Sequence, residues 1–254
     1  MNILCLIKQV PDSLEVHMGS DLTLQRDFVA QVLNHADESA VELALRLRDM
    51  HGGKVTALTM GPPRAEGTLR ELISRGVDEA VLLTDKAFAG ADTLATARAL
   101  TAAAQRLGPF DLLLFGRRAA DGETGQVGPM TAALMGLPCV ANITSAEAEG
   151  DTLTAHQLTE TGTVHWETHL PAALTLCEWS YALRLPTMRG LRAAKQAQIR
   201  IMKPEEIGIT DPTQIGLKGS PTRVTHISVR PSGVRPTKWI TAEEAMTIAE
   251  EVLS

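Results

Sequence analysis

The chain has few aromatic residues, no excess of positive charge and no long apolar run. Only 3% of its 254 residues are Phe, Trp or Tyr, so stacking of bases on aromatic side chains is not expected as its main activity. Its net charge of −6 also argues against a nucleic-acid partner, because nucleic-acid-binding surfaces are basic. No segment approaches the roughly 18 apolar residues that a membrane span needs. Nucleic-acid binding and a membrane span are therefore not expected.

Cysteine is scarce as well. Cys5, Cys139 and Cys177 are isolated, odd in number and set among apolar residues. They fit reduced thiols in a cytoplasmic protein better than a disulfide framework or a zinc site. Met1 leads directly into an apolar run, which leaves no room for a signal peptide. The histidines show no metal-ligand spacing, and no nucleophile is paired with a base, so neither a metal site nor a catalytic side chain is expected.

Short apolar runs alternate with amphipathic segments in the first half of the chain. They predict strands at 2–7, 54–60, 79–84 and 112–115, and helices at 34–50, 65–75, 92–107 and 127–135. This order predicts an α/β fold with a mostly parallel, doubly wound, Rossmann-like sheet that has helices on both faces. Ligands of such sheets bind beyond the carboxyl ends of the strands. The loops that qualify are residues 8–12, 60–63 and 116–127.

The pattern changes after residue 138. Alternating residues 151–158 and 162–168 predict an antiparallel hairpin, and strands are expected at 171–179 and 199–202. Residues 209–238 are rich in Pro, Gly and Thr and predict an extended arm. Thr241 and Glu244 have the spacing of a capping box and predict a final amphipathic helix. We therefore expect a nucleotide-binding α/β domain at 1–200, with a hairpin addition at about 151–180, and a C-terminal arm and docking helix at 201–254.

The rest of the chain is organised around residues 110–130, where an apolar strand leads through a glycine-bearing loop into a helix. This arrangement gathers free backbone N–H groups around an anion. Gly122, Gly125 and Gly128 let the backbone approach a ligand, and Thr124 and Gln126 supply side-chain hydrogen bonds. The sequence predicts a nucleotide-phosphate site here, although Thr and Gln before a helix also serve as simple caps.

Other polar residues at this edge have two interpretations each. Asn34 is a nucleotide contact or only a helix N-cap. Asp121 caps its turn or holds a ribose hydroxyl, and Lys8 neutralises a phosphate or faces solvent. Arg117 and Arg118 bind phosphate or stabilise an anionic flavin, or one of them is a surface residue.

Several motifs in the same order and spacing resemble the β subunit of electron transfer flavoproteins, in particular the FixA-like and electron-bifurcating members. They are residues 6–12, 34–42, 116–129, 170–172, 184–190, 194–195 and 216–222. The resemblance runs almost from end to end. It implies a heterodimer with a flavin-carrying α subunit, which the C-terminal arm embraces.

The resemblance leaves the nucleotide open between AMP, as in conventional members, and FAD, as in bifurcating members. Gly122, Thr124 and residues 127–129 favour FAD. In that case NADH is the electron donor, and electrons pass to ferredoxin or flavodoxin and, through the α-subunit FAD, to an acyl-CoA dehydrogenase or a related enzyme. A stand-alone adenine-nucleotide sensor or hydrolase on a similar fold is a third hypothesis.

Two sets of site residues follow from the resemblance and from their positions. The expected cofactor contacts are Leu6, Lys8, Asn34, His35, Ala36, Asp37, Met60, Gly116, Arg117, Arg118, Ala119, Ala120, Asp121, Gly122, Glu123, Thr124, Gly125, Gln126 and Val127. The expected partner-recognition loop consists of Arg184, Leu185, Pro186, Thr187, Met188, Arg189, Gly190 and Leu191. Met188 stands at the position of its apolar anchor, or else is a buried core residue.

Overall fold

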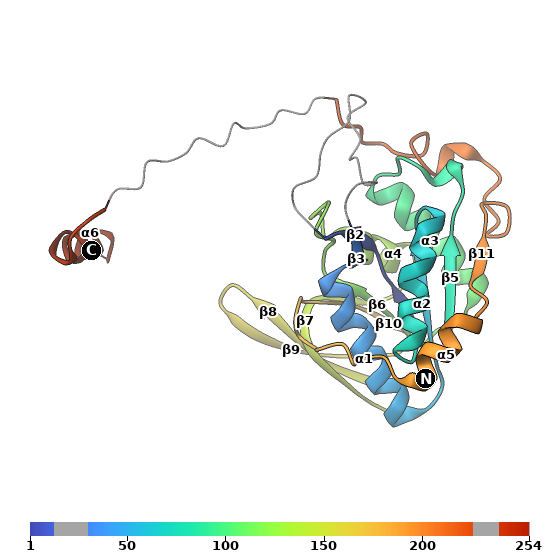
Figure 1. Ribbon diagram of the computed structural model, residues 1–254, viewed down its shortest axis with the longest axis horizontal. Coiled ribbons are helices and arrows are strands. Elements are labelled where there is room, and N and C mark those ends of the chain that lie inside the picture. Colours follow the sequence, from blue (N-terminus) through green and yellow to red (C-terminus); the bar gives the residue numbers. More distant parts are fainter. Residues whose placement is uncertain (13–29, 226–238, 254) are drawn as a thin grey trace. The chain divides into compact units, whose positions relative to one another are not determined.

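The computed structural model describes residues 1–12, 30–225 and 239–253 (Figure 1). They form two compact units, Met1–Arg223 and Val224–Ser254, which we describe separately. Among these residues, no helix is long and apolar enough to cross a membrane.

The first unit is built on a nine-stranded sheet with the order β11-β5-β4-β1-β6-β10-β7-β8-β9. Pairing is parallel from β11 to β7 and antiparallel among β7, β8 and β9. The strands are β1 (Asn2–Leu6), β4 (Lys54–Met60), β5 (Glu79–Leu83), β6 (Leu112–Gly116), β7 (Cys139–Glu149), β8 (Thr152–Thr159), β9 (Gly162–His169), β10 (Ala172–Leu176) and β11 (Arg200–Met202). A separate antiparallel pair is formed by β2 (Gln9–Pro11) and β3 (Gln31–Leu33).

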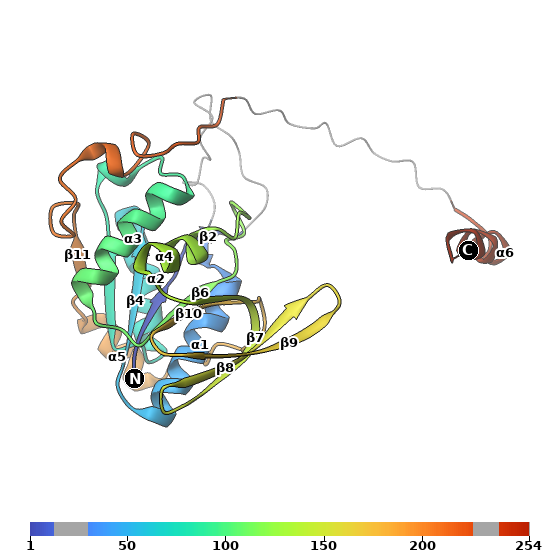
Figure 2. The ribbon, with the colours of Figure 1, turned by 180° about the vertical axis from the view of Figure 1, so that it is seen from behind.

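Helices cover both faces of the sheet (Figures 1 and 2). On one face lie α1 (His35–His51) and α2 (Glu66–Ser74), with α5 (Met188–Gln196) packed on α2. On the other face lie α3 (Thr93–Leu107) and α4 (Val127–Met135). Short 3-10 helices occur at Pro63–Ala65, Lys86–Phe88 and Pro212–Gln214. The predicted doubly wound α/β fold is confirmed.

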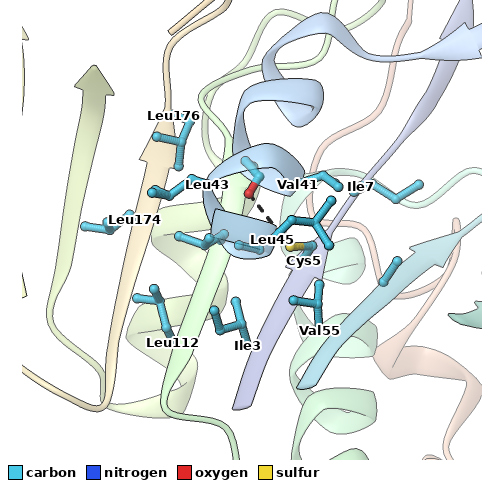
Figure 3. Close-up of a cluster of buried hydrophobic side chains, with 14 of the residues drawn as sticks. Ile3, Cys5, Ile7, Val41, Leu43, Leu45, Val55, Leu112, Leu174 and Leu176 are labelled. Atoms are coloured by element: carbon cyan, nitrogen blue, oxygen red, sulfur yellow. Dashed lines mark hydrogen bonds between the residues drawn. The ribbon is translucent and has the colours of Figure 1, made fainter. Parts of the chain in front are cut away.

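Successive side chains of β1 point to opposite faces of the sheet, and both faces are buried. Ile3 and Cys5 belong to the cluster on the α1 face, whereas Leu4 and Leu6 belong to the cluster on the α3 face. A strand buried on both faces reads as a continuous apolar run. Figure 3 shows side chains of α1 lying over β1, β4, β6 and β10, with the Cys5 thiol 3.9 Å from the carbonyl oxygen of Ala40.

Helix α5 and strands β2, β3 and β7 were not predicted from the sequence, and one strand is shorter than predicted. The 11-residue strand β7 lies where no element was expected, and α5 begins inside the predicted recognition loop. The predicted strand 171–179 ends at Leu176 in β10. The remaining predicted helices and strands that fall on described residues are confirmed to within about two residues at each end. The weak alternation of residues 13–33 predicts a small excursion from the domain, and most of it lies outside the described residues.

The first unit continues past residue 200, where we predicted the domain to end. Met202, Ile207 and Ile215 are buried in the cluster on the α3 face. The segment that follows is fixed to the start of α3, because the Asp92 carboxylate accepts hydrogen bonds from the backbone N–H and hydroxyl of Thr222 at 3.0 and 2.8 Å. The body of the protein therefore includes the first part of the predicted arm.

The second unit contains α6 (Ala242–Leu253). The predicted capping box at its start is confirmed. The backbone N–H of Thr241 donates to Glu244 Oε2 at 2.9 Å, and the backbone N–H of Glu244 donates to Thr241 Oγ1 at 3.3 Å. The large apolar side chains of Trp239 and Met246 are exposed.

Candidate functional site

The candidate site lies between β1 and β6, where the order in which the chain adds strands to the sheet reverses. The chain continues from β1 to β4 on one side, while β6 pairs with β1 on the other side. Ligands of open α/β sheets bind at such a switch point, beyond the carboxyl ends of the strands. Here α1 begins directly after β3, and α4 begins after the loop that follows β6. The structure thus brings the loops after β1 and β6 together.

Asp37 is the centre of the hydrogen bonds at this edge. Its buried carboxylate accepts from the backbone N–H of Lys8 at 2.6 Å, the Asn34 amide at 3.1 Å and the backbone N–H of Gly116 at 3.0 Å. Burial raises the pKa of Asp37 to about 7, although these hydrogen bonds and the charge of Lys8 act in the opposite direction. A Cβ at Gly116 would collide with the Asp37 carboxylate and with Ala36, so only glycine allows this approach.

Asn34 occupies the N-cap position of α1, but its side chain makes no capping hydrogen bond. Its amide donates to the carbonyl of Arg118 at 2.9 Å, and its oxygen accepts from the backbone N–H of Ala120 at 3.1 Å. Asn34 therefore holds the loop after β6 against the start of α1. Asn34 is thus more than a simple N-cap, and its contact with a nucleotide stays a prediction.

An ion pair closes the same loop from the other side. Lys8 Nζ lies 2.6 Å from Asp121 Oδ1, and the Asp121 side chain is only 4% exposed. The pair links the end of β1 to the centre of the loop, so the loop is held in place before any ligand arrives.

The second half of the loop is shaped as an anion cradle. Glu123 and Gly125 have left-handed backbones, with φ of 49° and 63°. Within the described part of the chain, the backbone N–H groups of Thr124, Gly125 and Gln126 donate to no other protein atom. These groups immediately precede α4, and unpaired N–H groups at a helix start bind anions such as phosphate. The Gln126 side chain accepts from the Thr93 hydroxyl at 2.9 Å, which links the cradle to the start of α3.

The two arginines of the loop share one carboxylate. Glu178 accepts from Arg117 Nη2 at 2.9 Å and from Arg118 Nε at 3.2 Å. Burial opposes ionisation of Glu178, but its own backbone N–H and the two arginines hold its pKa below the ordinary value. Arg117 Nε is buried and has no hydrogen-bond partner among the described residues. Glu178 was not among the predicted site residues, because the strand that precedes it was expected to run on to Trp179.

The other predicted contacts surround this centre. Leu6 and Ala36 are buried, Met60 and Val127 are half-buried, and Ala119, Ala120 and Gly122 lie in the loop itself. His35 is exposed at the start of α1, 6.1 Å from the Trp179 ring. Across the described residues, no group of three His, Cys, Asp or Glu side chains is arranged to hold a metal ion.

Comparison with known proteins identifies the family of the chain. The electron transfer flavoprotein domain model matches residues 21–206. The electron transfer flavoprotein subunit beta of Thermoanaerobacterium thermosaccharolyticum is 43% identical over 230 residues, which are 90% of this chain and 88% of that protein. Protein FixA of Bradyrhizobium diazoefficiens is 41% identical over 240 residues, or 91% and 83% of the two chains. The chain belongs to the electron transfer flavoprotein family.

Within this family it is an electron transfer subunit of the β or FixA type. A further relative, the acryloyl-CoA reductase electron transfer subunit gamma of Anaerotignum propionicum, is 38% identical over 232 residues, or 88% and 86% of the two chains. The family match includes the loop from Gly116 to Val127 and the start of α1.

The predicted recognition loop of this electron transfer flavoprotein subunit is part loop and part helix. Arg184 is tied to α1, since its side chain lies 3.1 Å from Glu42 and 2.8 Å from Asp49. The Thr187 hydroxyl accepts from the backbone N–H of Gly190 and caps α5. Leu185 and Met188 are 81% and 72% exposed, so Met188 is not a core residue. Pro186 is half-buried, and Arg189 and Leu191 are exposed.

Proposed function

We propose that this electron transfer flavoprotein subunit binds FAD at the carboxyl edge of β1 and β6 and takes part in NADH-dependent electron bifurcation. The observation that carries the proposal is the cradle at residues 124–126, where three successive N–H groups with no partner among the described residues precede α4. A cradle of this kind fits the phosphates of a nucleotide. Gly122 leaves open space beside it, because a Cβ there would meet no atom within 4 Å.

Each part of the site has a separate task in this proposal. The backbone at Thr124, Gly125 and Gln126 binds phosphate, and Asp37 and Asn34 hold the loop in shape. The unpartnered Arg117 Nε supplies a further buried donor. When bound, the flavin itself supplies the chemistry of accepting a hydride from NADH and passing on single electrons. The protein supplies position and electrostatics.

We propose three protein partners. An α subunit carrying the second flavin binds α6, whose apolar residues Met246 and Ile248 are exposed. An acyl-CoA dehydrogenase or related enzyme docks at residues 184–191, and ferredoxin or flavodoxin accepts low-potential electrons. The proposed compartment is the cytoplasm, since Cys5, Cys139 and Cys177 are free thiols.

A structural AMP is the second candidate, and one observation favours it. The three cations nearest the loop are already paired with carboxylates, Lys8 with Asp121 and both Arg117 and Arg118 with Glu178. A diphosphate needs more positive charge than a single phosphate held by backbone N–H groups. If FAD binds here, at least one of these ion pairs must therefore break, or must stay formed beside the added negative charge.

Cofactor extraction from the purified heterodimer tests the proposal. Two FAD per heterodimer are expected, whereas one FAD and one AMP would support the conventional alternative. A stable monomer that hydrolyses ATP would contradict both flavoprotein hypotheses.

A matched pair of variants tests the location of the site. Gly125 and Gly150 both have φ of 63°, but Gly125 lies in the cradle and Gly150 in the turn between β7 and β8. Gly125→Val should abolish nucleotide retention, and Gly150→Val should retain it. Equal retention by both variants would place the nucleotide elsewhere.

Docking at the recognition segment is tested in the same preparation. Met188→Ala should slow electron transfer to the dehydrogenase without changing the nucleotide content, because Met188 is exposed and belongs to α5, which packs on α2. Loss of nucleotide from this variant would contradict a docking role.

A further inference from the structure

The antiparallel hairpin of β8 and β9 places two histidines directly opposite each other. His156 pairs with His165 in the register of the two strands, and their ring centroids lie 4.2 Å apart in an edge-on arrangement. Both side chains are exposed. The residues are nine positions apart in the chain, so the spacing of histidines in the sequence does not reveal the pair.

The pair lies on the solvent-facing side of the hairpin. Leu153 and Ala155 alternate toward the core, which turns Thr154 and His156 outward. Cross-strand partners share a face, so Glu147 of β7 and Glu167 of β9, which both pair with Thr154, lie on this side too. A hollow of about 320 Å³ opens here, lined by Thr154, His156, His165, Trp166 and Glu167.

We propose that His156 and His165 form a two-histidine site for a borderline divalent cation such as Zn²⁺. Neutral imidazole nitrogens are good ligands for Zn²⁺, Ni²⁺ and Cu²⁺ and poor ligands for Mg²⁺. Because no third ligand converges in the described residues, water completes the coordination. The carboxylates of Glu147 and Glu167 add negative charge on the same face, which favours a cation over an anion.

The bound cation joins the two strands of an edge hairpin. β9 is the last strand of the sheet, and nearly all of its residues are exposed. One metal ligand from each strand adds a cross-strand link where few apolar contacts hold the pair. A cation that binds the folded hairpin and not the unfolded one therefore stabilises the folded hairpin by mass action. The site is independent of the nucleotide, which is proposed to bind between β1 and β6.

The test is a calorimetric titration of the full-length chain, purified without a histidine tag, with ZnCl₂, NiCl₂ and MgCl₂. We expect one Zn²⁺ or Ni²⁺ per chain and no heat from Mg²⁺. His156→Asn and His165→Asn should each lower the Zn²⁺ affinity at least about tenfold, because the second imidazole then no longer binds as a tethered ligand. His169→Asn is the matched control, since His169 is exposed on the same strand but pairs with Thr152.

Hydrogen exchange supplies a second readout. Zn²⁺ should slow exchange of the β8 and β9 amides in the wild type and in His169→Asn, but not in His156→Asn. Both histidines are exposed, so unchanged melting of the metal-free variants is expected and excludes misfolding. Absence of Zn²⁺ binding up to millimolar concentration would overturn the proposal, as would equal affinity of His156→Asn and the wild type.

Discussion

Asp37 shows how one residue can join three segments at a site. Its carboxylate accepts hydrogen bonds from Lys8, two residues after the end of β1, from Asn34 before the start of α1 and from Gly116 at the end of β6. A buried carboxylate with fewer donors would be costly to ionise. Even with these three donors, burial raises the pKa of Asp37 to about 7.

The pH dependence of stability follows from this pKa. Between the ordinary aspartate pKa of 3.8 and the pKa of about 7 in the folded protein, the folded state holds the Asp37 proton more tightly than the unfolded state does. Its contribution to stability is therefore fully present below about pH 4 and is lost as the pH rises through 7. Relative to Asp37→Asn, the wild type should lose up to about 1.4 kcal/mol per pH unit in this window, as measured by urea unfolding.

The control for this prediction is Asp12→Asn, because Asp12 is an exposed carboxylate near the same edge. Lys8 and Cys5 are the titratable neighbours of Asp37 and are unchanged in both variants. The curve of stability against pH for Asp12→Asn should run parallel to that of the wild type. If the Asp37→Asn curve also ran parallel, Asp37 would titrate at its ordinary value in the folded protein.

Glu178 sets how much positive charge the loop offers to a ligand. It neutralises one of the two charges of Arg117 and Arg118, so Glu178→Gln should make the site more attractive to an anion. We expect AMP affinity at low salt to rise about fivefold, since unit charges about 4 Å apart in water interact by about 1 kcal/mol. The gain should shrink in 0.5 M salt.

Isothermal titration with AMP at two salt concentrations measures this effect. Glu205→Gln removes an exposed carboxylate in the turn after β11 and should leave the affinity unchanged. A fall in affinity on Glu178→Gln would show instead that the carboxylate is needed to hold the arginines in position.

At the scale of elements, the sequence predicts the helices and strands that have a regular hydrophobic pattern or clear end signals. Strand β1 was predicted because its residues from Ile3 to Leu6 are all apolar and buried, and helix α4 because a glycine-bearing loop and Pro129 mark its start. β7 was not, since its alternation is broken. Asn142 has a left-handed backbone with φ of 57°, and the register shifts between Ile143 and Ser145. A bulge of this kind moves the later residues to the opposite face, so no continuous period of two remains in the sequence.

Helix α5 was missed for a different reason. The helix has only nine residues, and only Ala194 of its apolar stripe is buried. Tertiary contacts hold it instead. Arg70 donates to the carbonyls of Ala194 and Ala197 at 2.7 and 3.0 Å, and the backbone N–H of Thr187 donates to the carbonyl oxygen of Ser74 at 3.3 Å. Likewise, the pairing of Lys8 with Asp121 joins residues 113 positions apart, which no local pattern indicates.

The close approach of α5 to α2 depends on Gly190, where a Cβ would collide with the Ser74 carbonyl oxygen. Gly190→Ala should therefore displace α5 and destabilise the protein by about 1–3 kcal/mol. Hydrogen exchange should accelerate across α5 and leave β1 and β6 protected. Gly67→Ala in α2 is the matched control, because a Cβ there meets no atom within 4 Å. Its exchange pattern should equal that of the wild type.

At the scale of the whole molecule, stability and assembly are assigned to different parts of the chain. The buried apolar clusters lie entirely within Met1–Arg223. In the second unit, the described side chains of α6 are exposed, Met246 at 67% and Ile248 at 47%. Exposed apolar groups of this kind usually mark an interaction surface. The first unit therefore accounts for folding, and we expect α6 to contribute to binding the α subunit.

Removal of residues 239–254 separates these two roles. The truncated chain should melt at the same temperature as the full chain, because it loses none of the residues in the buried clusters. Its yield of heterodimer on co-expression with the α subunit should fall sharply. Met246→Ser combined with Ile248→Ser should reproduce the loss, whereas Glu250→Gln on the same helix should not. An undiminished yield from the truncated chain would show that the first unit binds the α subunit by itself, and a lowered melting temperature would show that α6 packs on the body of the protein.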